Sequence, residues 1–424
     1  MLVLFLAASA APTPLYRVYQ ARWGFSATTL TAVFAVYVVF LLITVLILGS
    51  LSDHVGRRPV IITALATDTA ACILFLLAHG AGALFAGRAL QGVAVGLAAT
   101  ALGAALLDLR PAGSLAPLVT SNAGTVGLAL GALGTSVLVQ YGPVPTTLVW
   151  WLLLGAFLAA ILLVAATPEP GTVRPGALAS LRPDVSVPRS ARGTFARAVP
   201  CLVAVWALGG FYLSLGPSLA AQLSGSHNLL WGGVITFLLT GLGAVTASAF
   251  RNSAPIAVML GGCLGLLGGA AVTIAAIATS TPALLLLGTV LAGLGFGPGN
   301  LGAYRVIMAR AAASNRAGMI SAVSTVNYLA FGLPALIAGV ATSHFGLHDT
   351  ALVYSAAIAL LAAAAAGGAL FESRARSTRA PEAAAPRTEL PPGPCTVPPY
   401  TQAALQETEP AKASADAAES TLPS

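Results

Sequence analysis

The stretch that decides the fold is GSLSDHVGRRP, Gly49–Pro59, which separates two apolar runs of sequence. One run extends from Leu30 to Leu48 before it, and the other extends from Val60 to Leu77 after it. Only 8% of the chain is charged, yet this short connector holds Asp53, His54, Arg57 and Arg58. Such a concentration of scarce charge between two apolar runs indicates that the connector has a role of its own.

The composition places the chain in a membrane. It has 424 residues, of which 57% are hydrophobic, and soluble domains carry about 25% charged residues, which is far above the 8% found here. Apolar runs recur from residue 2 to residue 371. The net charge of +7 comes from basic residues scattered between these runs, with no Lys/Arg patch of the kind that binds nucleic acid. We therefore expect a lipid bilayer as partner and no nucleic acid.

A helix needs about 20 apolar residues to cross the hydrocarbon of a bilayer. On that measure the sequence predicts an all-α polytopic membrane protein with twelve transmembrane helices. We expect an N-terminal six-helix half at 1–167, a Pro- and Arg-rich linker at 168–197, a C-terminal six-helix half at 198–371 and a disordered tail at 372–424. The spans are expected near 2–20, 28–51, 59–79, 82–107, 115–140, 145–167, 198–222, 229–250, 255–278, 282–309, 317–343 and 350–371.

The arginines predict the orientation, because basic loops stay on the cytoplasmic side. With both termini inside, 17 of the 20 basic residues fall on that side, only Arg17 and Arg22 fall outside, and Arg88 lies within a span. We therefore expect a multi-pass protein of the plasma membrane with cytoplasmic termini.

One shift of about 203–204 residues superposes the first half on the second. It places Gly92 and Gly96 on Gly295 and Gly299, Pro14 on Pro217, and Tyr141-Gly142 on Phe345-Gly346. The same shift would start the first helix about five residues before Met1, so we expect either an upstream start or an unusually short first helix.

The residues of the opening stretch fit a tight connection between two helices. Gly49 permits close helix approach, Gly56 permits a sharp turn, and Pro59 suits the first turn of the following helix.

The charges of this stretch can form a latch. Asp53 can accept hydrogen bonds at a helix N-terminus, where the dipole favours an anion. Arg57 and Arg58 can pair with Asp53 and with Asp108, the one acid at the end of the fourth span. Such pairs would form in one arrangement of the helices and break in another.

The stretch G-S-L-S-D-H-V-G-R-R resembles the G-x-x-x-D-R-x-G-R-R motif of the major facilitator superfamily, with His54 in place of the first arginine. A second stretch, R-A-L-Q-G with Arg88, Gln91 and Gly92, is similar to the R-x-x-Q-G motif of that family. The resemblance is nearest to its drug/metabolite:proton antiporter-like bacterial members, although the fifth span has glycines without their Gly-Pro step. It implies alternating access around a cavity lined by helices 1, 4, 7 and 10.

Three polar residues within spans are candidates for coupling. In the family the arginine that matches Arg88 faces the cavity and is linked to proton coupling or substrate charge, and Gln91 belongs to the same motif. The alternative for Arg88 is a hydrogen bond to backbone carbonyls that tethers the first helix. Asp68, in the middle of the third span, favours its neutral form in hydrocarbon, so it is either a proton carrier or a neutral or Ser/Thr-bonded acid between helices.

Uncharged polar and aromatic residues within the spans are candidates for binding the solute, and few charges favour an apolar or weakly polar one. Each aromatic alone can equally be packing. Asn300 is the strongest candidate of the second half, because Pro298 frees backbone groups that an amide can bind. The set is Thr13, Tyr16, Tyr37, Asn122, Trp206, Tyr212, Asn300, Tyr304, Asn327 and Tyr328.

We expect no catalytic residues, metal site or cofactor, because no catalytic, metal-binding or nucleotide-binding motif is present, and no enzyme activity. The sequence predicts a monomeric secondary transporter of a small solute, with proton-coupled efflux favoured. The alternatives are an importer or uniporter of the same fold, and a non-transporting membrane sensor.

Overall fold

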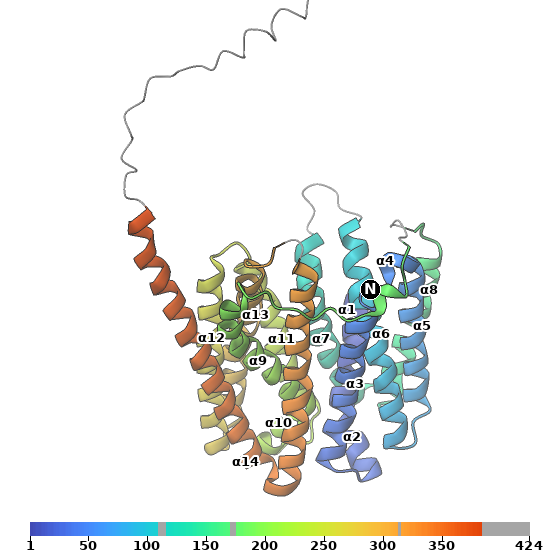
Figure 1. Ribbon diagram of the computed structural model, residues 1–424. Coiled ribbons are helices and arrows are strands. Elements are labelled where there is room, and N and C mark those ends of the chain that lie inside the picture. The colour runs from blue at the N-terminus through green and yellow to red at the C-terminus, as the bar shows by residue number, and fades with distance from the viewer. Residues whose placement is uncertain (109–115, 170–174, 313–314, 384–424) are drawn as a thin grey trace, which may run out of the picture. The chain divides into compact units, whose positions relative to one another are not determined.

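The computed structural model describes residues 1–108, 116–169, 175–312 and 315–383. All regular elements in these ranges are helices (Figure 1). Residues Met1–Arg374 form one compact unit, and Ala375–Ser424 form a second unit that contains the end of the last helix. All contacts described below lie within the first unit.

The first six spans are formed by helices that end at Ala165, and the remaining spans follow the linker. The helices are α1 (Leu2–Ala10), α2 (Pro12–Trp23), α3 (Ala27–Leu48), α4 (Ser52–Val55), α5 (Arg57–Leu76), α6 (Ala81–Asp108), α7 (Ala116–Tyr141), α8 (Leu148–Ala165), the 3-10 turn η1 (Ala179–Leu181), α9 (Arg192–Ser214), α10 (Gly216–Ser224), α11 (Leu230–Ala249), α12 (Pro255–Ala278), α13 (Pro282–Met308) and α14 (Arg316–Ala383).

Among the described residues, 11 helical stretches are long and apolar enough to cross a membrane. The last of them, Arg316–Phe371, is 56 residues long and is interrupted at Gly346, which has a φ of 81°. Figure 1 shows α14 as a hairpin with an orange arm and a red arm that meet at this point. Because the last stretch is divided at Gly346 into two spans, the 11 stretches account for the twelve predicted spans.

The prediction for the end of the chain needs a correction. The sequence predicted a disordered tail from residue 372, but α14 continues to Ala383. Arginine and alanine, which recur in this segment, have favourable helix propensities, so the helix does not end where the apolar run ends. Residues 384–424 lie outside the described part of the chain.

The first and seventh spans are both broken helices. The break between α1 and α2 falls at Ala11, and the break between α9 and α10 falls at Leu215, 204 positions later. Prolines follow both breaks, Pro12 and Pro217, and a proline cannot donate a backbone hydrogen bond to the preceding turn. The backbone stays in the right-handed helical region at Ala11 and at Leu215, so each division lies within one span and is not an unwound segment.

Two hydrophobic clusters form the core, and the first of them also takes in Leu213, Phe331 and Ala335 of the second half. One cluster of buried residues contains Phe5, Leu65 and Trp150 of the first half, and the other contains Leu202, Leu266 and Phe296 of the second. The halves touch along α7 and α11, where a Cβ added at Gly233 would lie 2.2 Å from Ser136 Oγ.

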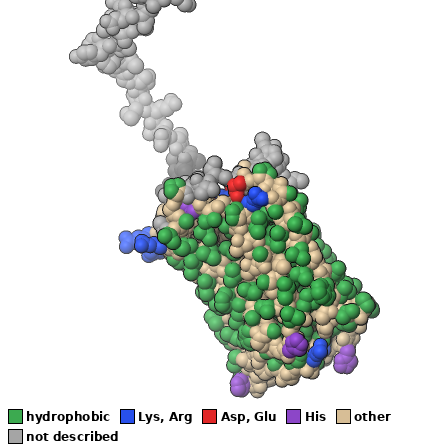
Figure 2. All heavy atoms as spheres, turned by 90° about the vertical axis from the view of Figure 1, so that its right-hand side faces the viewer, with side chains coloured by type: hydrophobic (Ala, Val, Ile, Leu, Met, Phe, Trp, Pro, Cys, Tyr) green, Lys and Arg blue, Asp and Glu red, His purple; other side chains and the backbone are tan. Residues whose placement is uncertain are grey.

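The sides of the bundle are apolar and the charges lie at its ends. On the face in Figure 2, hydrophobic side chains cover the middle, while coloured charged side chains lie toward the two ends. Leu162 and Val353, exposed at 72% and 71%, are examples of side chains available to lipid. We call the end that holds α4, Asp108 and the linker the basic end, and the end that holds Gly24 and Gly346 the opposite end.

Candidate functional site

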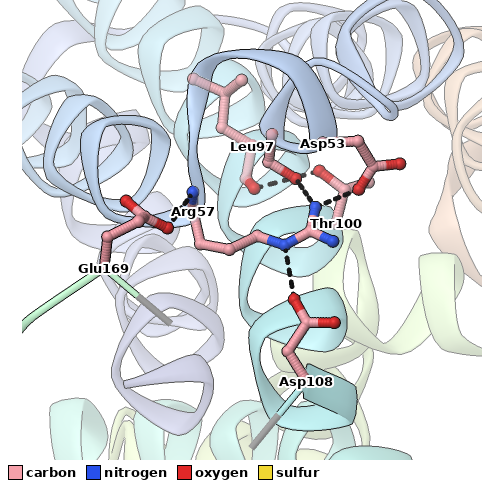
Figure 3. Close-up of polar contacts among 7 residues, drawn as sticks. Asp53, Arg57, Leu97, Thr100, Asp108 and Glu169 are labelled. Atoms are coloured by element: carbon pink, nitrogen blue, oxygen red, sulfur yellow. Dashed lines mark hydrogen bonds and ion pairs between the residues drawn. The ribbon is translucent and has the colours of Figure 1, made fainter. Parts of the chain in front are cut away.

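The charged connector folds into a cluster around Arg57 at the basic end (Figure 3). The Arg57 guanidinium forms an ion pair with Asp53 through Nη1, and its Nε donates to Asp108 Oδ2 at 3.0 Å. Nη1 also donates to Ser52 Oγ at 2.8 Å, and the Arg57 backbone N–H donates to Glu169 Oε1 at 2.7 Å. One arginine thus joins the α4–α5 turn, the end of α6 and the start of the linker.

The sequence places this arginine by local geometry. Asp53 and Arg57 are four residues apart, and Gly56 between them has a φ of 106°, a conformation that residues with a Cβ rarely adopt. The chain therefore turns at Gly56 and starts α5 with the Arg57 side chain directed back at Asp53.

Among the described residues the Arg58 side chain forms no ion pair with Asp53 or Asp108, which differs from our prediction. Its Nη2 donates to the carbonyl of Ala165 at the end of α8, and its backbone N–H donates to Glu169 Oε2 at 3.0 Å. The guanidinium instead satisfies a carbonyl at a helix C-terminus, where a cation is favoured. Glu169 was missed because it lies in the linker, far from the motif in sequence.

Gly49 is also not the point of closest helix approach. A Cβ at Gly49 would lie 3.6 Å from Thr100 Cγ2, the nearest atom of another helix, which is an ordinary contact. A Cβ at Gly92 would lie 2.4 Å from the Tyr37 carbonyl oxygen, and one at Gly96 would lie 2.7 Å from Thr44 Cβ. The glycines of the second motif therefore bring α3 and α6 together.

Arg88 is fully buried in the first half and is held by the broken first span. Its Nη1 donates to the Ser9 carbonyl and to Gln91 Oε1, both at 2.8 Å, and Gln91 Nε2 donates to the Ala8 carbonyl at 3.0 Å. Pro12 cannot supply the helical N–H that would normally bond to Ala8. The missing N–H of Pro12 leaves the Ala8 carbonyl to Gln91, and Arg88 bonds to the neighbouring Ser9 carbonyl, which is the contact of the tether alternative.

The same guanidinium lies against aromatic rings of α3. Arg88 Cζ is 4.1 Å from the centre of the Tyr37 ring and 5.8 Å from that of Phe34, within the range of cation–π attraction. The Nε atom of Arg88 has no hydrogen-bond partner in the described part of the chain.

Asp68 is buried close to Arg88. The side chain is 0% exposed, and Arg88 is near enough to act on it electrostatically. Neither carboxyl oxygen has a hydrogen-bond partner among the residues described, and the adjacent threonines bond to their own helix instead, Thr67 to Thr63 and Thr69 to Leu65. Within the described part of the chain Asp68 therefore has no Ser or Thr partner, and the choice between a proton carrier and a neutral acid between helices stays a prediction.

An aromatic cluster joins the two halves beside Arg88. Phe34 of α3 meets Phe331 of α14 edge-on at 5.0 Å, and Trp206 of α9 meets Phe331 at 5.6 Å and Tyr328 at 6.2 Å. Tyr37 lies against the same guanidinium as Phe34. We call Phe34, Tyr37, Trp206, Tyr328 and Phe331 the central aromatic cluster. The sequence did not single out Phe34 or Phe331, because phenylalanines in apolar spans carry no distinguishing signal.

Polar side chains surround this cluster. Trp206 Nε1 donates to Asn300 Oδ1 at 3.1 Å, so Asn300 bonds to an indole and not to backbone freed by Pro298. The hydroxyl of Tyr16 and Oδ1 of Asn327 are buried without hydrogen-bond partners in the described part of the chain. These atoms are available to a bound solute or to water.

Other predicted residues lie elsewhere. Asn122 Nδ2 donates to Ser248 Oγ at 2.7 Å, where α7 meets α11 at the basic end. The hydroxyls of Tyr212 and Thr289 are 2.9 Å apart within the second half, and Tyr304 is 37% exposed near the basic end. In the contacts described, Asn122, Tyr212 and Tyr304 do not join the central aromatic cluster.

Hydrogen bonds between the halves close the opposite end. Thr13 Oγ1 donates to the buried carbonyl of Leu213 at 3.0 Å. The hydroxyls of Thr28 and Ser343 are 2.9 Å apart. The backbone N–H of Leu229 donates to Gln140 Oε1 at 2.9 Å. Thr13 therefore joins the first span to the seventh, and its role in binding the solute stays a prediction.

Within the described residues, no group of three or more His, Cys, Asp or Glu side chains is arranged to hold a metal ion. The site consists of one buried cation, one buried carboxyl group and aromatic rings.

Known proteins agree with this architecture. The family model described as Major Facilitator Superfamily matches residues 1–263. The fold is similar to that of the human organic anion transporter MFSD10 (TETRAN), with a TM-score of 0.60, 18% identity, and 86% of this chain and 96% of that chain covered. It is also similar to that of a point mutant of the nucleoside transporter NupG, with a TM-score of 0.65, 12% identity, and 87% of this chain and 97% of that chain covered.

No curated protein sequence matches the chain. The family match nevertheless covers more than half of the 424 residues, and the similar solved folds span almost the whole length of their own chains. The chain thus belongs to the major facilitator superfamily and is a multi-pass membrane transporter of small-molecule solutes, not an enzyme.

Proposed function

We propose that this transporter exports a small, largely apolar or weakly polar solute in exchange for protons, by alternating access. The observation that carries the proposal is the juxtaposition of Arg88 and Asp68 with the central aromatic cluster, which takes residues from both halves. A solute held between Tyr37 of one half and Trp206 of the other would contact both halves at once. Movement of the halves would then change its surroundings.

Coupling to protons would come from the buried pair of opposite charges. An arginine stays protonated in a protein, so only Asp68 can change charge in this pair. When Asp68 is ionised it offsets the charge of Arg88, and when it is protonated it leaves that charge unbalanced beside Tyr37. A solute that contacts Arg88 and a proton that binds Asp68 can therefore compete, because each changes how the charge of Arg88 is balanced.

The cluster around Arg57 would act as a latch of the basic end. The arginine excess at that end supports a cytoplasmic location for it and for both termini, in the plasma membrane. The halves 1–167 and 198–371 would then move as units joined by the linker at 168–197. The protein would work as a monomer, because each half of the proposed cavity comes from the same chain.

Transport into proteoliposomes tests this proposal. A panel of neutral and weakly charged fluorescent dyes is added outside liposomes with an acidic lumen, and uptake is compared with and without a proton ionophore. We expect uptake of at least one dye that requires the pH gradient, and loss of that uptake in Arg88→Ala and Asp68→Asn.

The matched control is Arg22→Gln, which also removes one positive charge. Arg22 is exposed in the last turn of α2, at the opposite end of the bundle. This variant should transport normally. Gradient-independent transport would favour the uniporter alternative, and accumulation with the proton instead of against it would favour the importer. Normal coupled transport by Asp68→Asn would show that this carboxyl group carries no proton.

A further inference from the structure

The linker between α8 and α9 is attached to the first half at the basic end. Ser50 Oγ, at the end of α3, donates to the Ser180 carbonyl at 3.0 Å. His54 Nδ1 lies 3.2 Å from the Pro175 carbonyl oxygen. His54 stands where the family motif has an arginine, and its ring reaches the linker. The linker is therefore fastened to the same turn that carries the Arg57 cluster.

The linker is also attached to the second half, a few residues later. The backbone N–H of Ser186 donates to the Gly318 carbonyl at 3.3 Å, in the first turn of α14. A Cβ added at Gly318 would lie 2.1 Å from Ser186 Oγ and 3.0 Å from Asp184 Oδ1. The linker thus packs tightly against the start of the eleventh span.

Glu169 fastens the start of the linker to α5 and fixes the position of Arg57. Its two carboxylate oxygens accept the backbone N–H groups of Arg57 and Arg58, which open the 20-residue helix α5. A carboxylate at a helix N-terminus satisfies N–H groups that have no partner within the helix. The Arg57 side chain then reaches Asp53 and Asp108 from a fixed backbone (Figure 3).

The distance along the chain between the two attachments is short. Ser186 is six positions after Ser180, and an extended chain of six residue steps spans at most about 22 Å. The end of α3 and the start of α14 belong to different halves. They can separate only until this segment is straight, and further opening requires one attachment to break.

We infer that the linker is a tether that limits opening of the basic end, and that Glu169 is a positioning residue of the gate formed by the Arg57 cluster. The inference rests on the proposed alternating access, but its test needs neither a solute nor a gradient. It predicts that the length of residues 180–186 sets how far the basic end opens.

Lengthening the tether is the first test. Gly-Ser-Gly-Ser is inserted between Arg182 and Pro183 in a full-length chain whose native cysteines are replaced by serine and which carries Ser248→Cys at the basic end. We expect the rate at which a water-soluble maleimide labels this cysteine to rise severalfold. The same insertion between Thr279 and Ser280, in the connector between α12 and α13, is the control and should leave the rate unchanged. Equal rates for the two insertions would overturn the inference.

Glu169 is tested in the same background. Glu169→Ala should raise the labelling rate severalfold, and Glu169→Gln, which keeps one acceptor oxygen, should raise it less. Asp349→Asn at the opposite end removes the same charge and should have no effect. If Glu169→Ala does not fold, the insertion and Glu169→Gln still decide the question. Labelling unchanged in Glu169→Gln and in the insertion variant would overturn the role of the linker, whereas failure of dye transport alone would concern only the proposed function.

Discussion

Replacing Gly339 by alanine should open the opposite end of the transporter. Gly339 lies in the first arm of α14, and a Cβ added there would lie 1.7 Å from Thr31 Oγ1 and 2.6 Å from Thr31 Cβ in α3. Thr31 Oγ1 is fixed by hydrogen bonds to the carbonyls of Ala27 and Thr28 of its own helix, at 3.1 Å each. The clash therefore includes atoms that cannot rotate away.

The size of the effect follows from the cost of overpacking. Forcing extra carbon into a packed contact costs about 1–3 kcal/mol. The two elements belong to different halves, so separation of the halves relieves the clash. The whole cost then acts on the equilibrium between closed and open, which should shift toward open by roughly 5- to 150-fold.

Labelling of a single cysteine measures this shift. Ser343→Cys, which replaces the hydroxyl 2.9 Å from that of Thr28, reports on access from the opposite end. We expect Gly339→Ala to raise the rate at which a membrane-impermeant maleimide reacts. Gly268→Ala is the control, because a Cβ there meets nothing within 4 Å.

A compensating variant separates this mechanism from unfolding. Thr31→Gly removes the atoms with which the new Cβ collides, so Gly339→Ala combined with Thr31→Gly should return labelling toward the parent rate. Thr31→Gly costs about 1 kcal/mol of helix stability, which affects the open and closed states alike. If Gly339→Ala labels no faster than Gly268→Ala, the contact between α3 and α14 does not seal the opposite end.

Three further variants test other contacts. Asp53→Asn should leave membrane insertion intact and slow dye transport, because Arg57 loses its partner across the turn; a normal initial rate would exclude gating by this pair. Gly56→Ala should lower the Tm in detergent, since a φ of 106° with a ψ of 151° strains a residue with a Cβ by about 1–3 kcal/mol, and an unchanged Tm would contradict this. Trp206→Phe removes the N–H donated to Asn300, worth about 1 kcal/mol, and should raise KM about fivefold with kcat unchanged if this pair shapes the solute site.

The charged connector and the spans could be predicted from the sequence because both depend on local chemistry. A bilayer demands about 20 apolar residues per crossing, so hydropathy alone locates the spans. The pair Asp53 and Arg57 is likewise local, since four residues and a glycine turn bring it together. Asp108 could also be predicted as a partner of Arg57, because it is an acid at the end of the fourth span on the same side of the membrane as the connector.

The partners of Arg58 and Arg88 could not be predicted in the same way. Whether an arginine meets a carboxylate or a backbone carbonyl depends on which helix end lies beside it, and hydropathy does not carry that information. Arg58 meets the end of α8, and Arg88 meets carbonyls beside the break at Pro12. The sequence shows the prolines, but it does not show that α6 supplies the side chains that bond to the carbonyls beside them.

The sequence by itself therefore determined the class of protein, the spans and the charged connector, because each span and the connector is encoded within about 20 consecutive residues. The tertiary structure alone decided that Phe34 and Phe331 meet between the halves, that Glu169 caps α5, and that Asp68 is buried within electrostatic range of Arg88. Those contacts join residues from different helices, and apolar helices of similar composition pack by shape, which one sequence read along its length does not specify.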